Sequence, residues 1–338
     1  MTGRRGWGWF LLLAAAAAAA WAWAVFAPYG RYPAPRLVEI PAHSSTWQVA
    51  RQLRSAGVIR NAPSFELWVL AGSRRTLKAG WYRFDHPEAM PAIARRLERG
   101  DVFYRTLVVP EGFNRFDIAH ALERAGIVTA DAFLAATADA APVRDLDPQA
   151  ISLEGFLYPD TYRLPPRITA PEIAGMMVHR FRQVGNQLRP NVSFGDPAGP
   201  DSFHEWLTIA SLVEKETAQP PERPLIAGVF YNRLRQHVPL QCDPTVLYAA
   251  EAAGHPVTGA LRAADLRLAS PYNTYSHAGL PPGPIANPGR ASLVAAAHPA
   301  VTNFLYFVSN GAGGHRFART LLEQDRNILL YLQATGRR

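Results

Sequence analysis

Cysteine and lysine are nearly missing from this 338-residue sequence. Cys242 is the only cysteine, so no internal disulfide can form. The folded part of the chain must therefore be stabilised by its hydrophobic core. A lone thiol could act as a nucleophile, but no Cys/His signature surrounds it, and we expect a small, partly buried residue. Lysine occurs only as Lys78 and Lys215, so the net charge of +8 comes almost wholly from arginines spread along the chain.

Signatures of several function classes are missing as well. The ten histidines are scattered, and His204-Glu205 has no second histidine at helical spacing, so we expect no metal site. There is no Gly-x-Ser-x-Gly elbow, Walker loop or dinucleotide fingerprint, and no cofactor is expected. The sequence has no basic stripe and no nucleic-acid-binding motif, so nucleic acid is not an expected partner. The diffuse positive charge fits an arginine-rich composition or a mild attraction to an anionic lipid surface or cell wall.

Charge is absent from residues 7–28, a run of about 22 residues that is long enough to cross a membrane as a helix. Arg4 and Arg5 precede this run and tryptophans stand at both of its ends, as in a positive-inside anchor with interfacial aromatic residues. The alternative is a cleaved signal peptide, because Ala20-Trp21-Ala22 and Ala22-Trp23-Ala24 resemble small-x-small cleavage sites. Either interpretation exports the chain from residue 30 onward.

An internal repeat follows a short proline-rich spacer at residues 29–36. Ile40-Pro41 and the helical pattern from Trp47 to Val58 recur 69 residues later, at Val109-Pro110 and from Phe116 to Ile127. Each copy predicts a strand ending at proline, a polar turn, and a helix closed by glycine. Between the copies the pattern predicts a helix at 64–70, a strand at 80–84, and a helix at 90–99. We therefore expect an α+β fold, with a small module at 37–102 and a larger domain at 103–338. The alanine-rich stretch 130–150 reads as helical, before a core at 150–335.

Four stretches of the larger domain combine polar, aromatic and turn residues: 153–162, 210–217, 229–246 and 270–289. This composition suits sugar binding, in which aromatic faces stack on rings and amides bond hydroxyl groups. In the second stretch, Ser202 and Glu205 form a capping-box pattern, and a helix is predicted from about Phe203 to Thr217. Glu214 falls nearer the apolar face than Glu216, although by a small margin. Partial burial would raise the pKa of Glu214, which suits a general acid, whereas a solvated Glu-Lys-Glu run is the alternative.

These stretches, in this order behind an N-terminal anchor, resemble the MltG-type endolytic murein transglycosylases of the YceG-like family. The resemblance rests on Glu-Gly-x-x-x-Pro-Asp-Thr-Tyr, Glu-Lys-Glu-Thr, Asn-Arg-Leu, Gln-x-Asp-Pro-Thr, Tyr-Asn-Thr-Tyr and Leu-Pro-Pro-Gly-Pro-Ile occurring together. It implies a LysM-like glycan-binding module at 37–102, a transglycosylase domain at 103–338, and a catalytic role for Glu214. It also implies that further motif residues line the substrate cleft: Glu154, Tyr158, Asp160, Glu216, Asn232, Gln241, Asp243, Asn273 and Tyr275.

The resemblance also implies a reaction and a location. The C6 hydroxyl of N-acetylmuramic acid (MurNAc) would attack its own ring, so one carboxylate could serve as acid and then base and leave a 1,6-anhydro end. The chain would span the bacterial inner membrane once, with residues 1–6 cytoplasmic and the catalytic domain periplasmic. Its partners would be glycan strands and peptidoglycan synthases. Two alternatives remain open: a muramidase that pairs Glu214 with Asp243, Asp160 or Glu216, and a non-catalytic glycan-binding scaffold.

Overall fold

The computed structural model describes residues 3–72 and 76–336, and the chain is a mixed α+β protein. It divides into two compact units. The first comprises the chain up to Arg105 together with Arg163–Arg167, and the second comprises Thr106–Tyr162 together with the chain from Ile168 onward. Within the described ranges the six strands form three two-stranded sheets, so helices supply most of both cores.

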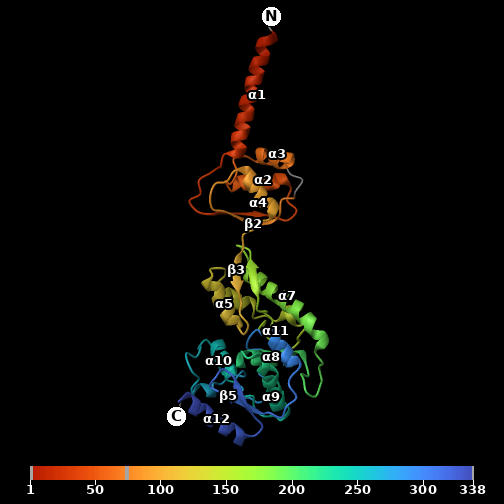
Figure 1. Cartoon of the computed structure of the whole chain (residues 1–338), viewed down its shortest axis with the longest axis vertical. Coiled ribbons are helices and arrows are strands. Elements are labelled where there is room, and N and C mark those ends of the chain that lie inside the picture. The colour runs from red at the N-terminus through yellow and green to blue at the C-terminus, as the bar shows by residue number, and fades with distance from the viewer. Residues whose placement is uncertain (1–2, 73–75, 337–338) are drawn as a thin grey trace. The chain divides into compact units, whose positions relative to one another are not determined.

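The first unit begins with the long apolar helix α1 (Gly3–Phe26), drawn in red in Figure 1. Its segment Trp7–Phe26 has a mean hydropathy of 1.9 and is long and apolar enough to cross a membrane, a property that signal sequences share. The last turn of α1 packs on the folded unit. Val25 is fully buried in its core, and the Arg60 guanidinium lies 3.6 Å from the centre of the Trp23 ring.

The rest of the first unit is a β-α-α-β arrangement followed by one more helix. The strands β1 (Arg36–Ile40) and β2 (Gly80–Phe84) pair antiparallel, with Ile40 opposite Gly80. Between them come α2 (Thr46–Ser55) and α3 (Ala62–Gly72), and α4 (Met90–Arg99) follows β2. Alternate strand residues, Val38 and Ile40 with Tyr82 and Phe84, enter a core shared with the helices. The elements predicted for this segment from the sequence are confirmed.

The repeat is confirmed as a structural repeat. The second copy consists of β3 (Arg105–Val108), which is hydrogen-bonded to β4 (Thr161–Leu164), and of α5 (Arg115–Arg124). Both helices begin with a complete capping box, Ser45 with Gln48 in α2 and Asn114 with Asp117 in α5. Both end before a glycine at positive φ, 66° at Gly57 and 63° at Gly126, where a side chain would strain the backbone.

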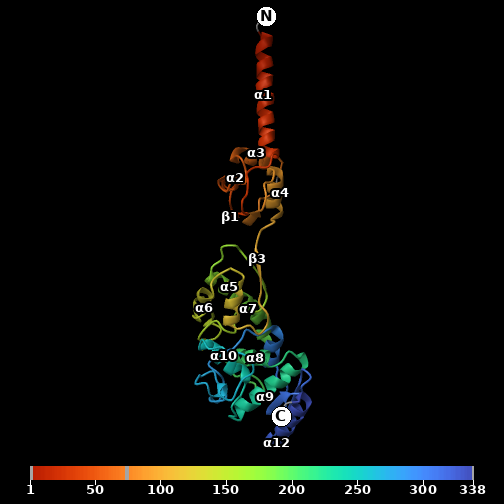
Figure 2. The same cartoon turned by 90° about the vertical axis from the view of Figure 1, so that its left-hand side faces the viewer.

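After α5 the alanine-rich stretch is helical only in α6 (Ala130–Ala136) and in a single 3-10 turn at Ala141–Val143. The expected helix is shorter because the Asp139 carboxylate accepts from the Ala141 amide at 2.9 Å, a turn that competes with a continuing helix. Pro142 then favours the tight 3-10 turn. The long helix α7 (Ala170–Leu188) packs on α6, and Figure 2 shows α5, α6 and α7 in one part of the second unit.

The remaining part of the second unit is built on α8 (Phe203–Glu216). It packs against α11 (Arg290–Ala297), α9 (Arg223–Arg235) and α10 (Asp243–Ala252), and every residue from Trp206 to Val213 is buried. Ser202 caps α8 as expected, but the Glu205 carboxylate accepts from the Asp201 amide rather than from Ser202, so the capping box is only half formed. The hairpin β5 (Tyr306–Ser309) and β6 (His315–Ala318) and the helix α12 (Leu321–Thr335) complete the unit.

Candidate functional site

Glu214 lies in the last turn of α8 and is largely enclosed. Its side chain is 6% exposed, and its Oε2 accepts a hydrogen bond of 2.9 Å from the Gly289 amide. The Arg223 guanidinium at the start of α9 lies 3.9 Å from its Oε1. Gly112, in the turn before α5, packs against the Glu214 side chain. The orientation of the Glu214 carboxylate is therefore fixed by the Gly289 amide, the Arg223 guanidinium and the Gly112 turn.

A second carboxylate, Glu111, lies beside this group. Its oxygens lie so close to Gly289 that a Cβ there would be 2.0 Å from Oε1, so a side chain at position 289 would displace the Glu111 carboxylate. Burial and then the negative charge of Glu214 raise the pKa of Glu111, while Arg223 opposes the shift. Glu111 and Arg223 line a pocket of about 670 Å³ with Arg290 and residues of α11.

Glu111 lies outside the sequence motifs, although the repeat contains a signal for it. Gly112 and its counterpart His43 both have positive φ, 77° and 63°, so the two copies use the same turn. The residue before that turn position is Ala42 in the first copy and Glu111 in the second. A carboxylate that appears in only one of two otherwise matched turns is not needed by the turn itself, and could have been singled out on that ground.

Glu216 points to a different environment. Its Oε1 accepts a hydrogen bond from the Cys242 thiol at 3.0 Å. Burial raises the pKa of Glu216, and the hydrogen bond from Cys242 lowers it by a smaller amount. It lines a pocket of about 330 Å³ whose other members include Gln241, Asp243 and Tyr275. The Tyr275 hydroxyl donates to Asp243 at 2.6 Å. Four of the expected cleft residues are thus brought together, in a pocket that Glu214 does not line.

Three other expected cleft residues are engaged inside the protein. Glu154 is 2% exposed and accepts hydrogen bonds from the Arg115 amide and the Asn287 side chain, both at 3.0 Å. The Asn273 amide group donates to two backbone carbonyls of the preceding loop. The Asn232 side-chain amide donates to the carbonyls of Thr302 and Phe304, before β5, at 2.7 and 2.9 Å. These contacts fix loops around the site.

Tyr158 and Asp160 lie together on the segment before β4. The Asp160 carboxylate accepts from the Arg180 guanidinium of α7 at 2.6 Å, and Arg180 also lies over the Tyr158 ring. The Tyr162 hydroxyl donates to the Tyr158 carbonyl. Tyr158 is buried, whereas the Asp160 side chain is 37% exposed. This pair ties the segment to α7. Burial and then the negative charge of Glu111 raise the pKa of Tyr158, so Tyr158 lies near the carboxylate beside Glu214.

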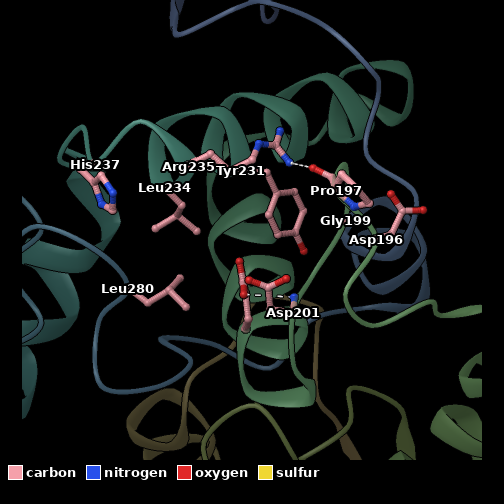
Figure 3. A pocket seen from close by; sticks show the side chains of 10 residues that line it. Asp196, Pro197, Gly199, Asp201, Tyr231, Leu234, Arg235, His237 and Leu280 are labelled. Carbon is pink, nitrogen blue, oxygen red and sulfur yellow. Dashed lines mark hydrogen bonds between the residues drawn. The ribbon is translucent and has the colours of Figure 1, made fainter.

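A further pocket, of about 440 Å³, lies at the opposite end of α8 (Figure 3). Figure 3 shows Asp201 next to the start of α8 and Tyr231 and Arg235 on α9, with the Arg235 guanidinium directed at the Pro197 carbonyl. Burial raises the pKa of Glu205 in this pocket, and the hydrogen bond from the Asp201 amide opposes the shift. It contains none of the site residues expected from the sequence.

Comparison with known proteins gives the family. The model of the YceG-like family matches residues 38–329. The endolytic murein transglycosylase of Bacillus subtilis is 32% identical over an alignment of 313 positions, and the match covers 88% of this chain and 85% of that protein. The protein of the same name from Streptococcus pneumoniae is 30% identical over 86% of this chain, but the match spans only 57% of that longer protein.

A solved structure agrees with these matches. The crystal structure of a yceG-like protein from Listeria monocytogenes shares 32% sequence identity with this chain and a TM-score of 0.59, covering 86% of this chain and 98% of that one. The sequence resemblance is thereby confirmed over most of the chain. This chain belongs to the YceG-like family.

Proposed function

We propose that this chain is an endolytic lytic transglycosylase of peptidoglycan. It cleaves the bond between MurNAc and N-acetylglucosamine (GlcNAc) in glycan strands and leaves 1,6-anhydro-MurNAc ends. The observation that carries the proposal is the enclosed, oriented carboxylate of Glu214, at the motif position that carries the resemblance. Relatives at 30 to 32% identity, named as endolytic murein transglycosylases, support it.

One carboxylate suffices for this reaction in two proton transfers. Protonated Glu214 donates its proton to the glycosidic oxygen while the bond from that oxygen to C1 of MurNAc breaks. The resulting carboxylate then takes the proton of the C6 hydroxyl as O6 bonds to C1, so Glu214 ends protonated and no water is consumed. The Gly289 amide keeps the carboxylate in one orientation through both steps.

Glycan recognition is assigned to two places. In the catalytic domain at 103–338, with its core at 150–335, the pocket with Gln241, Asp243 and Tyr275 offers an amide, a carboxylate and a phenol for sugar hydroxyl and acetamido groups. Glu154, Tyr158, Asp160, Asn232 and Asn273 act through the loops that they fix. In the small module at 37–102, the β-α-α-β arrangement of β1, α2, α3 and β2 supports a LysM-like glycan-binding role.

The proposed location follows from α1. Residues 7–28 anchor the chain in the inner membrane as a single span, with residues 1–6 in the cytoplasm and the two domains in the periplasm. In that position the enzyme meets glycan strands as peptidoglycan synthases extrude them. Cleavage there would terminate glycan elongation.

The test is digestion of purified, uncrosslinked glycan strands by the wild type and by Glu214→Gln. We expect wild type to release fragments with 1,6-anhydro ends, identified by mass, and the variant to lose at least about a thousandfold in rate, because general acid–base catalysis alone contributes up to about four orders of magnitude. Cleavage that survives in a folded Glu214→Gln protein would contradict the assignment and favour a non-catalytic scaffold or another catalytic acid.

A two-carboxylate muramidase is the second candidate, and one observation favours it. Glu111 lies beside Glu214, whereas Asp243 and Glu216 line a different pocket and Asp160 pairs with Arg180. Glu111 could activate a water in place of the C6 hydroxyl. Digestion in ¹⁸O-labelled water separates the two reactions, because hydrolysis puts the label into a reducing end and the transglycosylase reaction does not.

A further inference from the structure

The two segments that touch Glu214 are joined to each other by one buried residue. Gly112 packs against Glu214, and Gly289 donates to it. Asn287, which is fully buried, bridges them: its backbone amide donates to the Phe113 carbonyl at 2.9 Å, and its carbonyl accepts from the Gly112 amide at 3.0 Å. The turn before α5 and the segment before α11 therefore close on Glu214 as one piece.

The side chain of Asn287 is held from three directions. Its Oδ1 accepts from the Leu157 amide at 2.8 Å, and its Nδ2 donates to the Phe113 carbonyl at 2.9 Å. The other proton of Nδ2 goes to Glu154 Oε1 at 3.0 Å. In a fully buried amide each of these groups costs about 1–3 kcal/mol if it is left unpaired. The orientation of Asn287 therefore depends on an acceptor at Glu154.

Glu154 also fixes the other segment directly. Its Oε2 accepts from the amide of Arg115, the first residue of α5, where the helix dipole favours a negative charge. One carboxylate thus holds both the start of α5, which follows the Gly112 turn, and Asn287, which precedes Gly289. Because the Glu154 side chain lies in the interior, its role must be exerted through these neighbours.

We propose that Glu154 is a positioning residue, which acts through Asn287 to keep the Gly112 and Gly289 segments closed around Glu214. The consequence for glycan cleavage rests on the proposed function, whereas the structural link between Glu154 and the two segments does not. Loss of the link leaves Glu214 in place on α8 but loosens the groups that orient it. A displacement of about 1 Å at a reacting group can cost on the order of a hundredfold in rate.

The experiment uses the full chain in detergent and four variants. In Glu154→Gln, the new NH₂ group must face either the Asn287 NH₂ or the Arg115 amide, so one hydrogen bond is lost. In Asn287→Asp, the Nδ2 donor to Glu154 and to the Phe113 carbonyl becomes an acceptor, so both hydrogen bonds are lost at a pH above 7, where Glu154 is ionised. The double variant reverses donor and acceptor and restores a hydrogen bond between the two side chains. Asp147→Asn is the control, since Asp147 is a carboxylate of the same unit that is 1% exposed and bonds to His204 instead.

Two readouts are measured for each variant: amide hydrogen exchange of the segments 111–115 and 285–291, and kcat and KM on uncrosslinked glycan. We expect Glu154→Gln to speed exchange in both segments and to lower kcat about tenfold to a hundredfold with KM within about twofold. Asn287→Asp should lower kcat further, and the double variant should have a kcat about tenfold higher than that of Asn287→Asp. Asp147→Asn should leave exchange in the two segments unchanged.

The outcomes separate the inference from the proposed function. Unchanged exchange in Glu154→Gln, or a double variant no better than Asn287→Asp, would overturn the positioning role whatever the activity. Faster exchange in both segments, in a chain whose cleavage is absent or indifferent to Glu214→Gln, would support the link and refute the proposed function. Faster exchange with an unchanged kcat would show that the link does not serve cleavage and would overturn the proposal.

Discussion

Glu214 and Glu216 are two residues apart on α8, yet they belong to different surroundings. The Gly289 amide and Arg223 enclose the first, and the Cys242 thiol and the pocket of Gln241 enclose the second. The helical wheel could not separate them, because both lie at the edge of the apolar face. Their separation is made by loops that come from distant positions in the sequence, and no local pattern encodes which loop covers which side of a helix.

Cys242 is expected to be unreactive in the native protein. It is 2% exposed, and burial, together with the negative charge of Glu216, raises the pKa of its thiol. A disulfide reagent should therefore label it only after unfolding. Replacement by alanine should cost about 1–3 kcal/mol, because the buried Glu216 oxygen loses its donor. Cys242→Ser keeps a donor and should lose less in urea unfolding; an alanine variant as stable as the serine variant would speak against this hydrogen bond.

Glu154 should make stability depend on pH. Burial raises the pKa of Glu154 from 4.5 to about 7, so between these values the folded chain holds a proton that the unfolded chain has released. The free energy of unfolding should therefore fall as pH rises from about 4.5 to 7, by roughly 3 kcal/mol, and level off above. Glu154→Gln should remove this decrease. Urea titrations at several pH values measure it, with the exposed Asp131→Asn as control; an equal slope in wild type and Glu154→Gln would contradict the assignment.

At the scale of elements, the helix caps of the repeat can be compared directly. Ser45→Ala removes an exposed cap from α2 and should cost about 1 kcal/mol. Asn114→Ala removes the cap of α5 and also the donor to Glu251, at 2.6 Å in a buried setting, and should cost about 2 kcal/mol or more. Native-state hydrogen exchange of the two helices in urea measures each loss separately. Asn114→Ser keeps only the cap and should recover about half of the stability that Asn114→Ala loses. Equal losses of stability in Ser45→Ala and Asn114→Ala would refute the comparison.

The elements that the sequence predicted best are those with local signals. The first unit and both repeat copies have turn prolines, capping boxes and glycines at positive φ, and the strands and helices there were predicted within a few residues. The site was predicted less completely. Glu111 is indicated only by comparison of the two repeat copies, and Asn287 has no sequence signal of its role. Glu111 reaches Gly289 across 178 positions of chain, and Asn287 reaches Glu154 across 133. Such contacts follow from tertiary packing, which periodicity does not report.

At the scale of the whole chain, arginines have structural partners in both units. In the first unit, Arg60 and Arg36 stack on aromatic rings near the end of α1 and the spacer. In the second, Arg223, Arg233 and Arg180 lie at pockets and loops around the candidate site. Much of the positive charge therefore has structural partners. The +8 charge thus includes arginines that the fold itself uses.

The anchor is expected to be retained in the mature protein. Cleavage after Ala22 would remove Trp21, and cleavage after Ala24 would also remove Trp23 from its contact with Arg60. Both positions lie in the turn of α1 that packs on the first unit, where Val25 is fully buried and the Phe26 ring meets Trp68 edge-on at 5.3 Å. Loss of this turn would expose that apolar surface to water, at a cost of roughly 25 cal/mol per Å².

Intact-mass measurement of protein extracted from bacterial membranes checks this expectation. We expect a mass that includes α1, and a chain that stays in the membrane pellet after alkaline carbonate washing, as a spanning helix of 20 apolar residues would. A matched chain with a strong signal-peptidase site inserted after Phe26 should lose the helix and appear in the soluble fraction. A wild-type N-terminus at Trp23 or Val25 would instead establish a cleaved signal peptide, and the catalytic unit would then act free of the membrane.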